Sequence, residues 1–325
     1  MTDERVNEMS PVGEVVPAEA GQETPPAMQK RKKKHSAISI INQVLVYVVL
    51  ILLALVVLVP FYLVIISSFK SNYEINASVG QSFRWWPERF SKDGYAAVIS
   101  TGGEVEFILG STVIGAFFNT LWQSLVPALV GVFVSGMCGY ALAKLKFPFR
   151  NSIFTLLLAT MMIPGTITMV SSYMLFDTIG WTEGPLPLII PGLFGGASNV
   201  FFMRQYFEGV PDELLDAAKI DGLDNFRTFL YIAMPVSVPV FVSLSLLSFI
   251  GHYNAYLNPL IYIGSNSQFY TLQVMLSKMT GGLLKGHWDM ILAACVLSIL
   301  PLLLIYLITQ KFFIKGISIS SGLKG

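Results

Sequence analysis

Charge is what this sequence has least of. Only 13% of its 325 residues are Asp, Glu, Lys or Arg, about half the share usual in a soluble domain, whereas 54% are hydrophobic and the mean hydropathy is +0.63. The 21 basic and 20 acidic residues nearly cancel, which excludes a nucleic-acid-binding protein held by bulk electrostatics. The composition therefore predicts a membrane protein.

Cysteine and histidine are also scarce. Cys138 and Cys295 lie inside apolar runs, and none of the three histidines has metal-ligand spacing to a cysteine or carboxylate, so we expect neither a disulfide framework nor a metal site. The sequence contains no G-x-x-x-x-G-K-[ST] motif for holding a triphosphate and no G-x-S-x-G nucleophile motif. We therefore predict no cofactor and no enzymatic activity.

The first 35 residues differ in composition from the rest of the chain. They combine Pro25 and Pro26 with scattered Glu and a run of five Lys and Arg at residues 30–34. Such a segment buries too little apolar surface to offset its ordering entropy, so we predict a disordered tail at 1–35 and a transmembrane domain at 36–325. The basic run before the first apolar stretch predicts a cytoplasmic N-terminus.

Long apolar runs set the fold class. A bilayer core of about 30 Å needs roughly 20 helical residues. Stretches of about that length without Asp, Glu, Lys or Arg occur at residues 44–69, 113–143, 152–176, 186–203, 228–253 and 290–310. We predict an all-α membrane protein with six transmembrane helices. The chain stays uncharged from Thr228 to Ser277, too long for one crossing, so we expect a break near Asn254 to Pro259. Kinks or unwound turns are expected at Pro164, Pro235, Pro239 and Pro259.

The distribution of cations supports an even number of spans in the cell membrane. With both termini in the cytoplasm, fifteen Lys and Arg fall on the inner side and six on the outer side. Tryptophan gives the same orientation, because Trp85, Trp86, Trp181 and Trp288 all fall near predicted outer faces, where an indole can lie between lipid and water.

The loop between the fourth and fifth spans, residues 208–227, is strongly amphipathic. Pro211 is expected at the first helical position, N1, with Asp212 and Glu213 in the first turn, and Gly222 is typical of a helix end. Asp224 is the expected N-cap of a second helix. Its apolar stripe is expected to comprise Leu214, Leu215, Ala218 and Ile220. From physics alone, this helix either lies on the headgroups or presents a surface to a partner.

The spacing in this loop resembles that of ABC-importer permeases. Their pattern E-A-A-x-x-x-G, then nine residues, then I-x-L-P is matched by Asp216-Ala217-Ala218, Gly222 and Ile232-Ala233-Met234-Pro235. Two positions depart conservatively, Asp216 for Glu and Met234 for Leu. Other segments resemble maltose-type sugar-importer permeases: Asn119-Thr120-Leu121, Gly139 to Lys144, Phe147-Pro148, Arg150, Met162-Ile163-Pro164, and Phe313 to Gly316 through Leu323 to Gly325.

The resemblance implies a type I permease bundle with a cytoplasmic coupling helix. It implies a second homologous permease, a cytoplasmic ATPase dimer and an extracytoplasmic solute-binding protein that docks on the outer loops Ser71 to Gly110 and Gly264 to Asp289. The ATPase-coupling residues carried over from the family pattern, with the neighbouring Asp221, are Asp216, Ala217, Ala218, Asp221, Gly222, Ile232 and Pro235.

The cargo is less well determined by the sequence. Polar side chains suited to a neutral sugar or oligosaccharide occur at Thr166, Thr168, Ser172, Tyr253, Asn254 and Asn258, and the same residues could instead form hydrogen bonds between helices. An ion-coupled secondary transporter is the alternative function. It fits less well, because such carriers place ionisable groups at mid-membrane and these spans contain only His252, which we interpret as an interfacial residue.

Overall fold

A computed structural model describes residues 37–78, 84–282 and 284–322, with side chains from 41 to 310 except at 79–83, 104, 107 and 283. The predicted tail at 1–35 lies outside the described residues. The chain forms two units, 1–55 and 56–325. In the first, the structure describes the beginning of α1 (Ala37–Ser67), a continuous apolar helix whose side chains at residues 41–55 are exposed.

The described residues of both units are helices and the turns between them. After α1 they follow in the order α2 (Asn72–Ala77), α3 (Asp93–Ile99), α4 (Glu104–Leu109), α5 (Val113–Lys144), α6 (Arg150–Met161), α7 (Gly165–Thr178), α8 (Leu186–Leu193), α9 (Ala197–Glu208), α10 (Asp212–Ile220), α11 (Asn225–Thr228), the π-helix η1 (Phe229–Ala233), α12 (Met234–Val236), α13 (Val238–Tyr253), α14 (Leu257–Ile263), the 3₁₀ turn η2 (Ser267–Phe269), α15 (Leu272–Gly281) and α16 (Trp288–Gly322).

Four helical stretches are long and apolar enough to cross a membrane: Ile41–Ser67, Val113–Lys144, Leu186–Glu208 and Trp288–Gln310. Two bent pairs raise the number to six if each is one span. They are α6 with α7, bent by 95°, and Asn225–Val236 with α13, bent by 83°. The six predicted runs therefore all correspond to helix, and the third and fifth are each broken into two helices.

Proline explains both breaks. Pro164 precedes α7 in an extended conformation, because a proline ring clashes with a helical carbonyl one turn back and lacks the N–H for the next bond. Pro235 and Pro239 flank the second bend at Ser237. The expected break in the long uncharged stretch is confirmed, since α13 ends at Tyr253 and α14 begins at Leu257.

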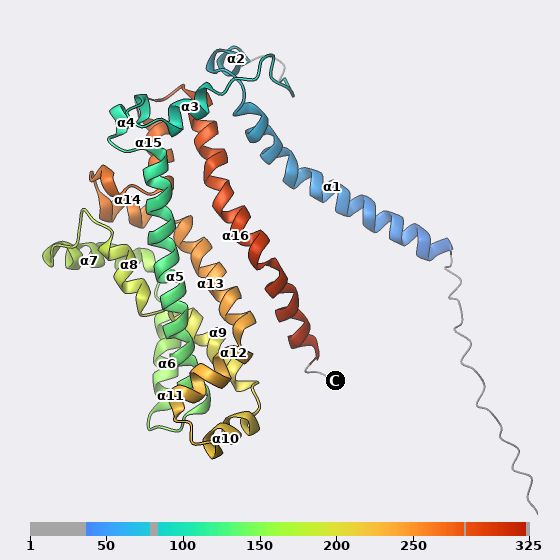
Figure 1. The fold of residues 1–325 in the computed structure, drawn as a ribbon, viewed down its shortest axis with the longest axis vertical. Coiled ribbons are helices and arrows are strands. Elements are labelled where there is room, and N and C mark those ends of the chain that lie inside the picture. The colour runs from blue at the N-terminus through green and yellow to red at the C-terminus, as the bar shows by residue number, and fades with distance from the viewer. Residues whose placement is uncertain (1–36, 79–83, 283, 323–325) are drawn as a thin grey trace, which may run out of the picture. The chain divides into compact units, whose positions relative to one another are not determined.

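Helix α5 is the central element of the second unit, with α8, α9 and α13 packed against it (Figure 1). Small residues permit this close approach. A Cβ added to Gly139 would lie 2.6 Å from the Cβ of Met203 on α9, and one added to Gly131 would overlap the carbonyl of Gly192. Close backbone packing through small residues is a common way of joining helices in a membrane.

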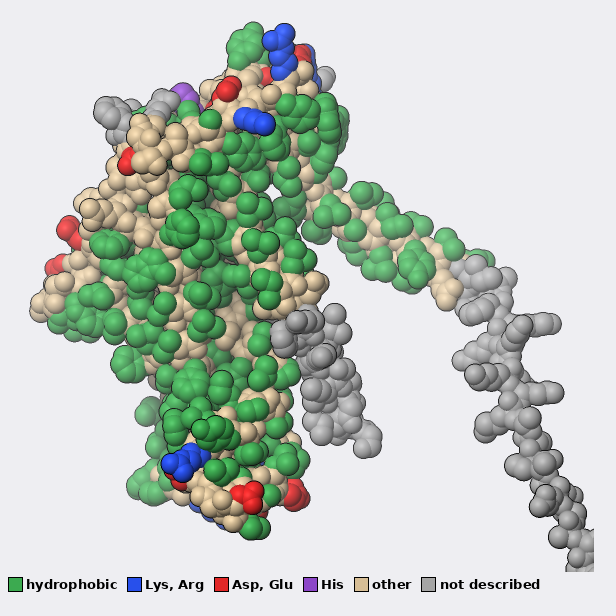
Figure 2. Space-filling view, viewed as in Figure 1, with side chains coloured by type: hydrophobic (Ala, Val, Ile, Leu, Met, Phe, Trp, Pro, Cys, Tyr) green, Lys and Arg blue, Asp and Glu red, His purple; other side chains and the backbone are tan. Residues whose placement is uncertain are grey.

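Charged side chains lie mainly at the ends of this bundle. Figure 2 shows apolar side chains over the middle of the visible face, with Lys, Arg, Asp and Glu gathered at the two ends and further Asp and Glu on one flank. The end that carries α10 and α11 is the predicted cytoplasmic end, and the opposite end carries α2, α3 and α4 (Figure 1).

Candidate functional site

The helix predicted in the loop at 208–227 is present as α10. Pro211 is its N-cap, one position before the expected N1, and Asp212 and Glu213 form its first turn. Lys219 lies in the last turn. This distribution of charge suits the helix dipole at both ends.

A Schellman motif ends α10 at the predicted glycine. Gly222 has a φ of +81°, which a glycine adopts without steric cost. Its N–H donates to the Lys219 carbonyl at 3.0 Å, and the Leu223 N–H donates to the Ala218 carbonyl at 3.0 Å. The backbone therefore turns sharply, and a Cβ at Gly222 would meet no other atom within 4 Å.

The faces of α10 separate the predicted coupling residues into two groups. Asp216, Ala217, Asp221 and Gly222 are exposed, so a partner can reach them. Ala218 is buried beside Leu215 against the bundle, so this member of the motif serves packing in the chain itself.

The predicted apolar stripe is wrong at two positions. Leu214 is 44% exposed and Ile220 is 87% exposed, in contrast to the buried pair Leu215 and Ala218. Successive helical residues rotate by about 100°, so Ile220 falls on the outer face with Ala217. A large exposed aliphatic side chain next to small residues is typical of a surface that meets another protein.

Lys144, which the sequence did not identify as functional, fixes α10 to the bundle. At the inner end of α5, its Nζ lies 2.6 Å from Asp212 Oδ1 and donates to the Val210 carbonyl at 2.6 Å. The hydrogen bond and positive charge of Lys144 hold the pKa of the Asp212 carboxyl below its usual range. A lone cation after an apolar helix gives no sequence signal of its partner, which is 68 residues away.

The remaining two coupling residues lie in the bend that follows α11. Asp224 caps α11 as predicted, its Oδ1 accepting the Arg227 N–H at 2.7 Å. Ile232 is half-buried in η1 and Pro235 is exposed in α12, so neither lies on α10. The Ser237 hydroxyl donates to the Ala233 carbonyl at 2.7 Å within this bend.

Aromatic packing connects this bend to the centre of the bundle. The Tyr140 ring lies 5.6 Å from Phe207 and 5.5 Å from Phe229, between centroids. Phe241, on α13, lies 6.4 Å from Phe229. Because Leu215 of α10 belongs to the same buried cluster, a displacement of α10 acts directly on α5, α9 and α13.

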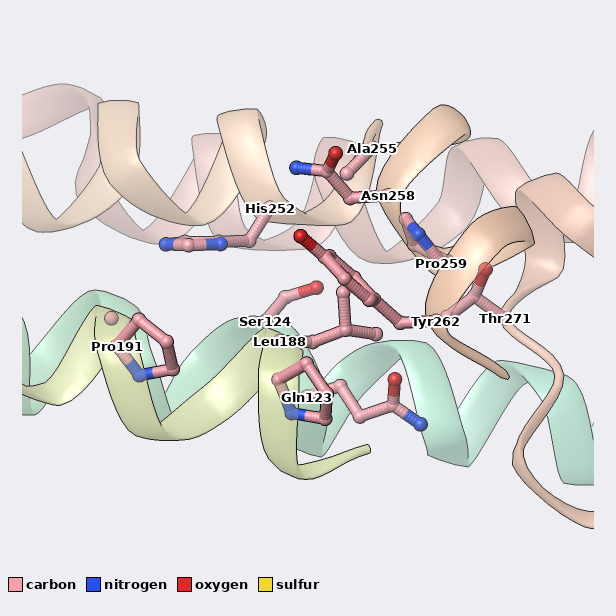
Figure 3. A pocket seen from close by; sticks show the side chains of 12 residues that line it. Gln123, Ser124, Leu188, Pro191, His252, Ala255, Asn258, Pro259, Tyr262 and Thr271 are labelled. Atoms are coloured by element: carbon pink, nitrogen blue, oxygen red, sulfur yellow. The ribbon is translucent and has the colours of Figure 1, made fainter. Parts of the chain in front are cut away.

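A second candidate site is a cavity of about 210 Å³ between α5, α8, α13 and α14 (Figure 3). Its polar lining residues are Gln123, Ser124, His252, Asn258, Tyr262 and Thr271, and its apolar ones include Pro187, Leu188, Pro191 and Pro259. No Asp, Glu, Lys or Arg lines it. In Figure 3 the Tyr262 hydroxyl lies among the side chains of Ser124, His252 and Asn258.

Two atoms in this lining lack hydrogen-bond partners within the described part of the chain. Gln123 and Thr271 are each only 4% exposed. The Gln123 amide donates to the Phe269 carbonyl at 3.2 Å, but its Oε1 and the Thr271 hydroxyl remain unpaired. A buried unpaired polar atom costs about 1 to 3 kcal/mol, so such a pair indicates a place where a polar molecule binds.

Of the residues predicted for a substrate path, Asn258 lines the cavity. Tyr253 does not, because its ring is buried and its hydroxyl donates to the Ser298 carbonyl at 2.7 Å, which ties α13 to α16. Asn254 is exposed in the turn after α13. The others, Thr166, Thr168 and Ser172, lie on α7 and are not among the lining residues, although Tyr173 of the same helix stacks on Tyr262 of the lining, 6.3 Å between ring centroids.

Cavity residues that the sequence analysis missed come from distant segments. Gln123 and Ser124 lie in the middle of α5, and Thr271 precedes α15. His252, interpreted as an interfacial residue, is half-buried in the lining. Among the described residues, no three His, Cys, Asp or Glu side chains come together as metal ligands.

Comparisons with known proteins agree on one family. Residues 131–319 match the binding-protein-dependent transport system inner membrane component. The arabinooligosaccharides transport system permease protein AraQ of Bacillus subtilis is 33% identical over 268 residues, covering 82% of this chain and 91% of AraQ. The sn-glycerol-3-phosphate transport system permease protein UgpE of Rhizobium meliloti is 26% identical over 85% of this chain and 96% of UgpE.

The fold is also similar to a solved structure. A bacterial ABC transporter involved in the import of the acidic polysaccharide alginate contains a chain that superimposes with a TM-score of 0.72. The match covers 86% of this chain and 98% of the other, at 22% identity. At that identity the likeness concerns the fold alone.

Proposed function

The chain belongs to the family of binding-protein-dependent transport system inner membrane components, and from this premise we propose how it couples to its partners and what it carries. It is a multi-pass inner membrane protein and the permease of a binding-protein-dependent ABC importer, not an enzyme. We propose that it pairs with a second homologous permease and an ATPase dimer, with both termini in the cytoplasm.

The ATPase contact is proposed to be the outer face of α10. Asp216, Ala217, Asp221 and Gly222 supply an exposed surface with small side chains, and Ile220 adds an apolar anchor. Open space around Gly222 lets a partner surface approach the backbone. Ala218 is left out of this contact because it is buried.

Movement of α10 then reaches the pore through buried contacts. Lys144 joins α10 to the end of α5, and Leu215 packs in the cluster that contains Phe229 and Phe241. Because packed side chains resist deformation, an ATPase that pulls α10 would tilt α5 and α13 with it. Ile232 and Pro235 are assigned to the bend that transmits this motion.

The proposed cargo is a neutral sugar or oligosaccharide. The observation that carries this assignment is the cavity, which combines unpaired hydrogen-bonding atoms of Gln123 and Thr271 with no charged side chain. Sugar hydroxyls both donate and accept hydrogen bonds, so they suit amide and hydroxyl groups. A phosphate cargo, as in the name of UgpE, would require cations that this lining lacks. AraQ, named for arabinooligosaccharides, agrees with the neutral assignment.

Reconstituted transport tests the proposal. In proteoliposomes, the chain with a second permease, an ATPase dimer and a binding protein is expected to take up a neutral oligosaccharide only with ATP. The chain alone is expected to carry none. Uptake by the lone chain in response to an ion gradient would instead support a secondary transporter.

A substitution at the coupling surface tests the ATPase contact separately. Gly222→Asp places a charged side chain in the open space beside α10, and we expect ATP hydrolysis to become uncoupled from uptake. Normal coupling in this variant would contradict the assigned contact.

A further inference from the structure

The segment from Arg84 to Lys92, here called the outer aromatic loop, displays large rings at the end of the bundle opposite α10. Trp86 and Phe90 are each 59% exposed, and Trp85 is similarly exposed. The rings of Trp86 and Phe90 pack edge to face, 5.6 Å between centroids. Exposed aromatic residues that cluster in this way indicate a surface with an apolar partner.

Buried charges hold the backbone of this loop in place. Lys70, only 3% exposed, donates to the Arg84 carbonyl at 2.6 Å, and the Glu74 carboxylate accepts the Glu88 N–H at 3.0 Å. Burying an ion costs free energy unless it is well bonded, so these contacts make the loop a defined structure. The rings face outward from a fixed backbone.

A hydrogen bond to α1 sets the depth of the loop. The Tyr62 hydroxyl donates to the Trp85 carbonyl at 3.0 Å. Tyr62 lies five residues before Ser67, the last residue of α1. At a rise of about 1.5 Å per residue, this places Tyr62 about 8 Å from the end of the helix. The loop therefore folds back beside the end of a membrane span and lies at the level of the lipid headgroups.

The charges of the loop suit this level. Arg84 pairs with Glu88, and Asp93, just after the loop, accepts the Ser91 hydroxyl at 2.8 Å. Arg89 and Lys92 are exposed and form no ion pair with the described residues, so the loop presents uncompensated positive charge beside its rings. Indole rings prefer the membrane interface, and guanidinium groups bind phosphate.

We propose that the outer aromatic loop is a membrane anchor that inserts into the headgroup layer of the outer leaflet. Trp86 and Phe90 lie at the boundary with the acyl chains, and Arg89 binds phospholipid phosphate. The family resemblance predicts that the whole outer segment 71–110 contacts the binding protein. In this proposal the outer aromatic loop contacts lipid instead, and the residues from α3 onward remain for the binding protein.

Site-directed spin labelling tests the anchor. Cys138 and Cys295 are first replaced by alanine, and Trp86→Cys or Phe90→Cys is then labelled with a nitroxide in the full-length chain in phosphatidylethanolamine and phosphatidylglycerol nanodiscs. Tyr73→Cys on α2 is the matched control, an exposed aromatic residue outside the loop. Two loop positions are used so that one poorly folding variant does not decide the result.

For a nitroxide at position 86 or 90, the collision rate with oxygen, which concentrates in lipid, is expected to exceed the collision rate with a water-soluble nickel complex several-fold. For a nitroxide at position 73, we expect the nickel complex to give the higher collision rate. Arg89→Gln is expected to move the label at 86 toward water. Equal nickel access at all three positions would overturn the proposal. Protection of position 86 only when binding protein is added would also overturn it, because the loop would then be a protein-docking surface.

Discussion

Lys144 joins the inner end of α5 to α10 through two short hydrogen bonds. Lys144→Met removes the donor to the Val210 carbonyl, a charge-assisted bond worth about 1.5 to 3 kcal/mol, and the ion pair with Asp212. We expect amide hydrogen exchange in α10 to become at least tenfold faster. Lys146→Met is the control, since Lys146 is exposed two residues further on. Equal protection in the two variants would show that α10 is held by apolar packing alone.

The same ion pair predicts a pH dependence. Lys144 lowers the pKa of Asp212, so the folded state favours the carboxylate. The resulting stabilisation is complete above the usual carboxyl pKa of about 3.9 and is lost as the pH falls through the lowered value in the folded chain. Protection of α10 in hydrogen exchange, corrected for intrinsic rates, should fall in that acid range. Asp212→Asn should remove this dependence, and an unchanged profile would contradict it.

The ends and caps of the helices in the coupling loop could be predicted from the sequence, but which side chains of α10 are buried and which are exposed could not. The residue types identified Gly222 as a helix end and Asp224 as an N-cap because each acts locally on the backbone. Leu214 and Ile220 were wrongly placed in the buried stripe, since which side of a short helix is buried depends on what packs against it. Lys144 was missed for the same reason, because its partner is distant in sequence.

Among the elements, the end of α10 depends on one backbone conformation. Gly222→Ala adds a methyl group in open space, yet at a φ of +81° it should destabilise the turn by about 1 kcal/mol. Gly222→Asn should cost less, because Asn tolerates this conformation. Gly209→Ala, at a φ of −82°, is the control. Hydrogen exchange at Leu223 reports the effect, and equal exchange in the alanine variants would refute it.

The contact between α5 and α9 depends on the absence of a side chain. Gly139→Ala would place Cβ 2.6 Å from the Met203 Cβ and 2.8 Å from the Arg204 backbone nitrogen, so we expect a loss of about 1 to 3 kcal/mol. Gly165→Ala, where a Cβ meets nothing within 4 Å, should be neutral or slightly stabilising. Thermal unfolding in detergent compares them. A similar melting temperature for both would mean that the helices can move apart freely.

Hydropathy predicted where the helices lie along the chain more reliably than it predicted where they are broken. Six charge-free runs correspond to helices because lipid leaves the backbone no other hydrogen-bond partners. The prolines predicted kinks, as found at Pro164 and Pro235, but a sequence does not give the angle of a bend. That angle depends on the packing of neighbouring helices.

At the scale of the whole molecule, the cavity shows what one sequence could not predict. Gln123 and Thr271 are 148 positions apart and meet only because α5 passes the turn before α15. Neither belongs to a recognisable pattern. Polar chemistry alone predicted both Asn258 and Tyr253 for the substrate path, yet only Asn258 lines the cavity, and the Tyr253 hydroxyl forms a hydrogen bond between helices.

Gln123→Leu distinguishes a binding site from a packing defect. The substitution removes the costly unpaired Oε1 together with the Nε2 donor to the Phe269 carbonyl, two changes that oppose each other in stability. If Oε1 serves no ligand, uptake by the folded importer should be unchanged. If it binds a sugar hydroxyl, the solute concentration for half-maximal uptake should rise about tenfold, the equivalent of about 1.4 kcal/mol. We expect the second result in reconstituted importer.

Gln310→Leu provides a matched control, since it makes the same change at an exposed position on α16 outside the cavity lining. Its uptake should equal that of the unmodified chain. A defect common to both variants would point to a general effect of the substitution on the bundle. A defect in uptake confined to Gln123→Leu, with an unchanged melting temperature, would assign Gln123 to contact with the solute, because a packing defect would lower the melting temperature as well.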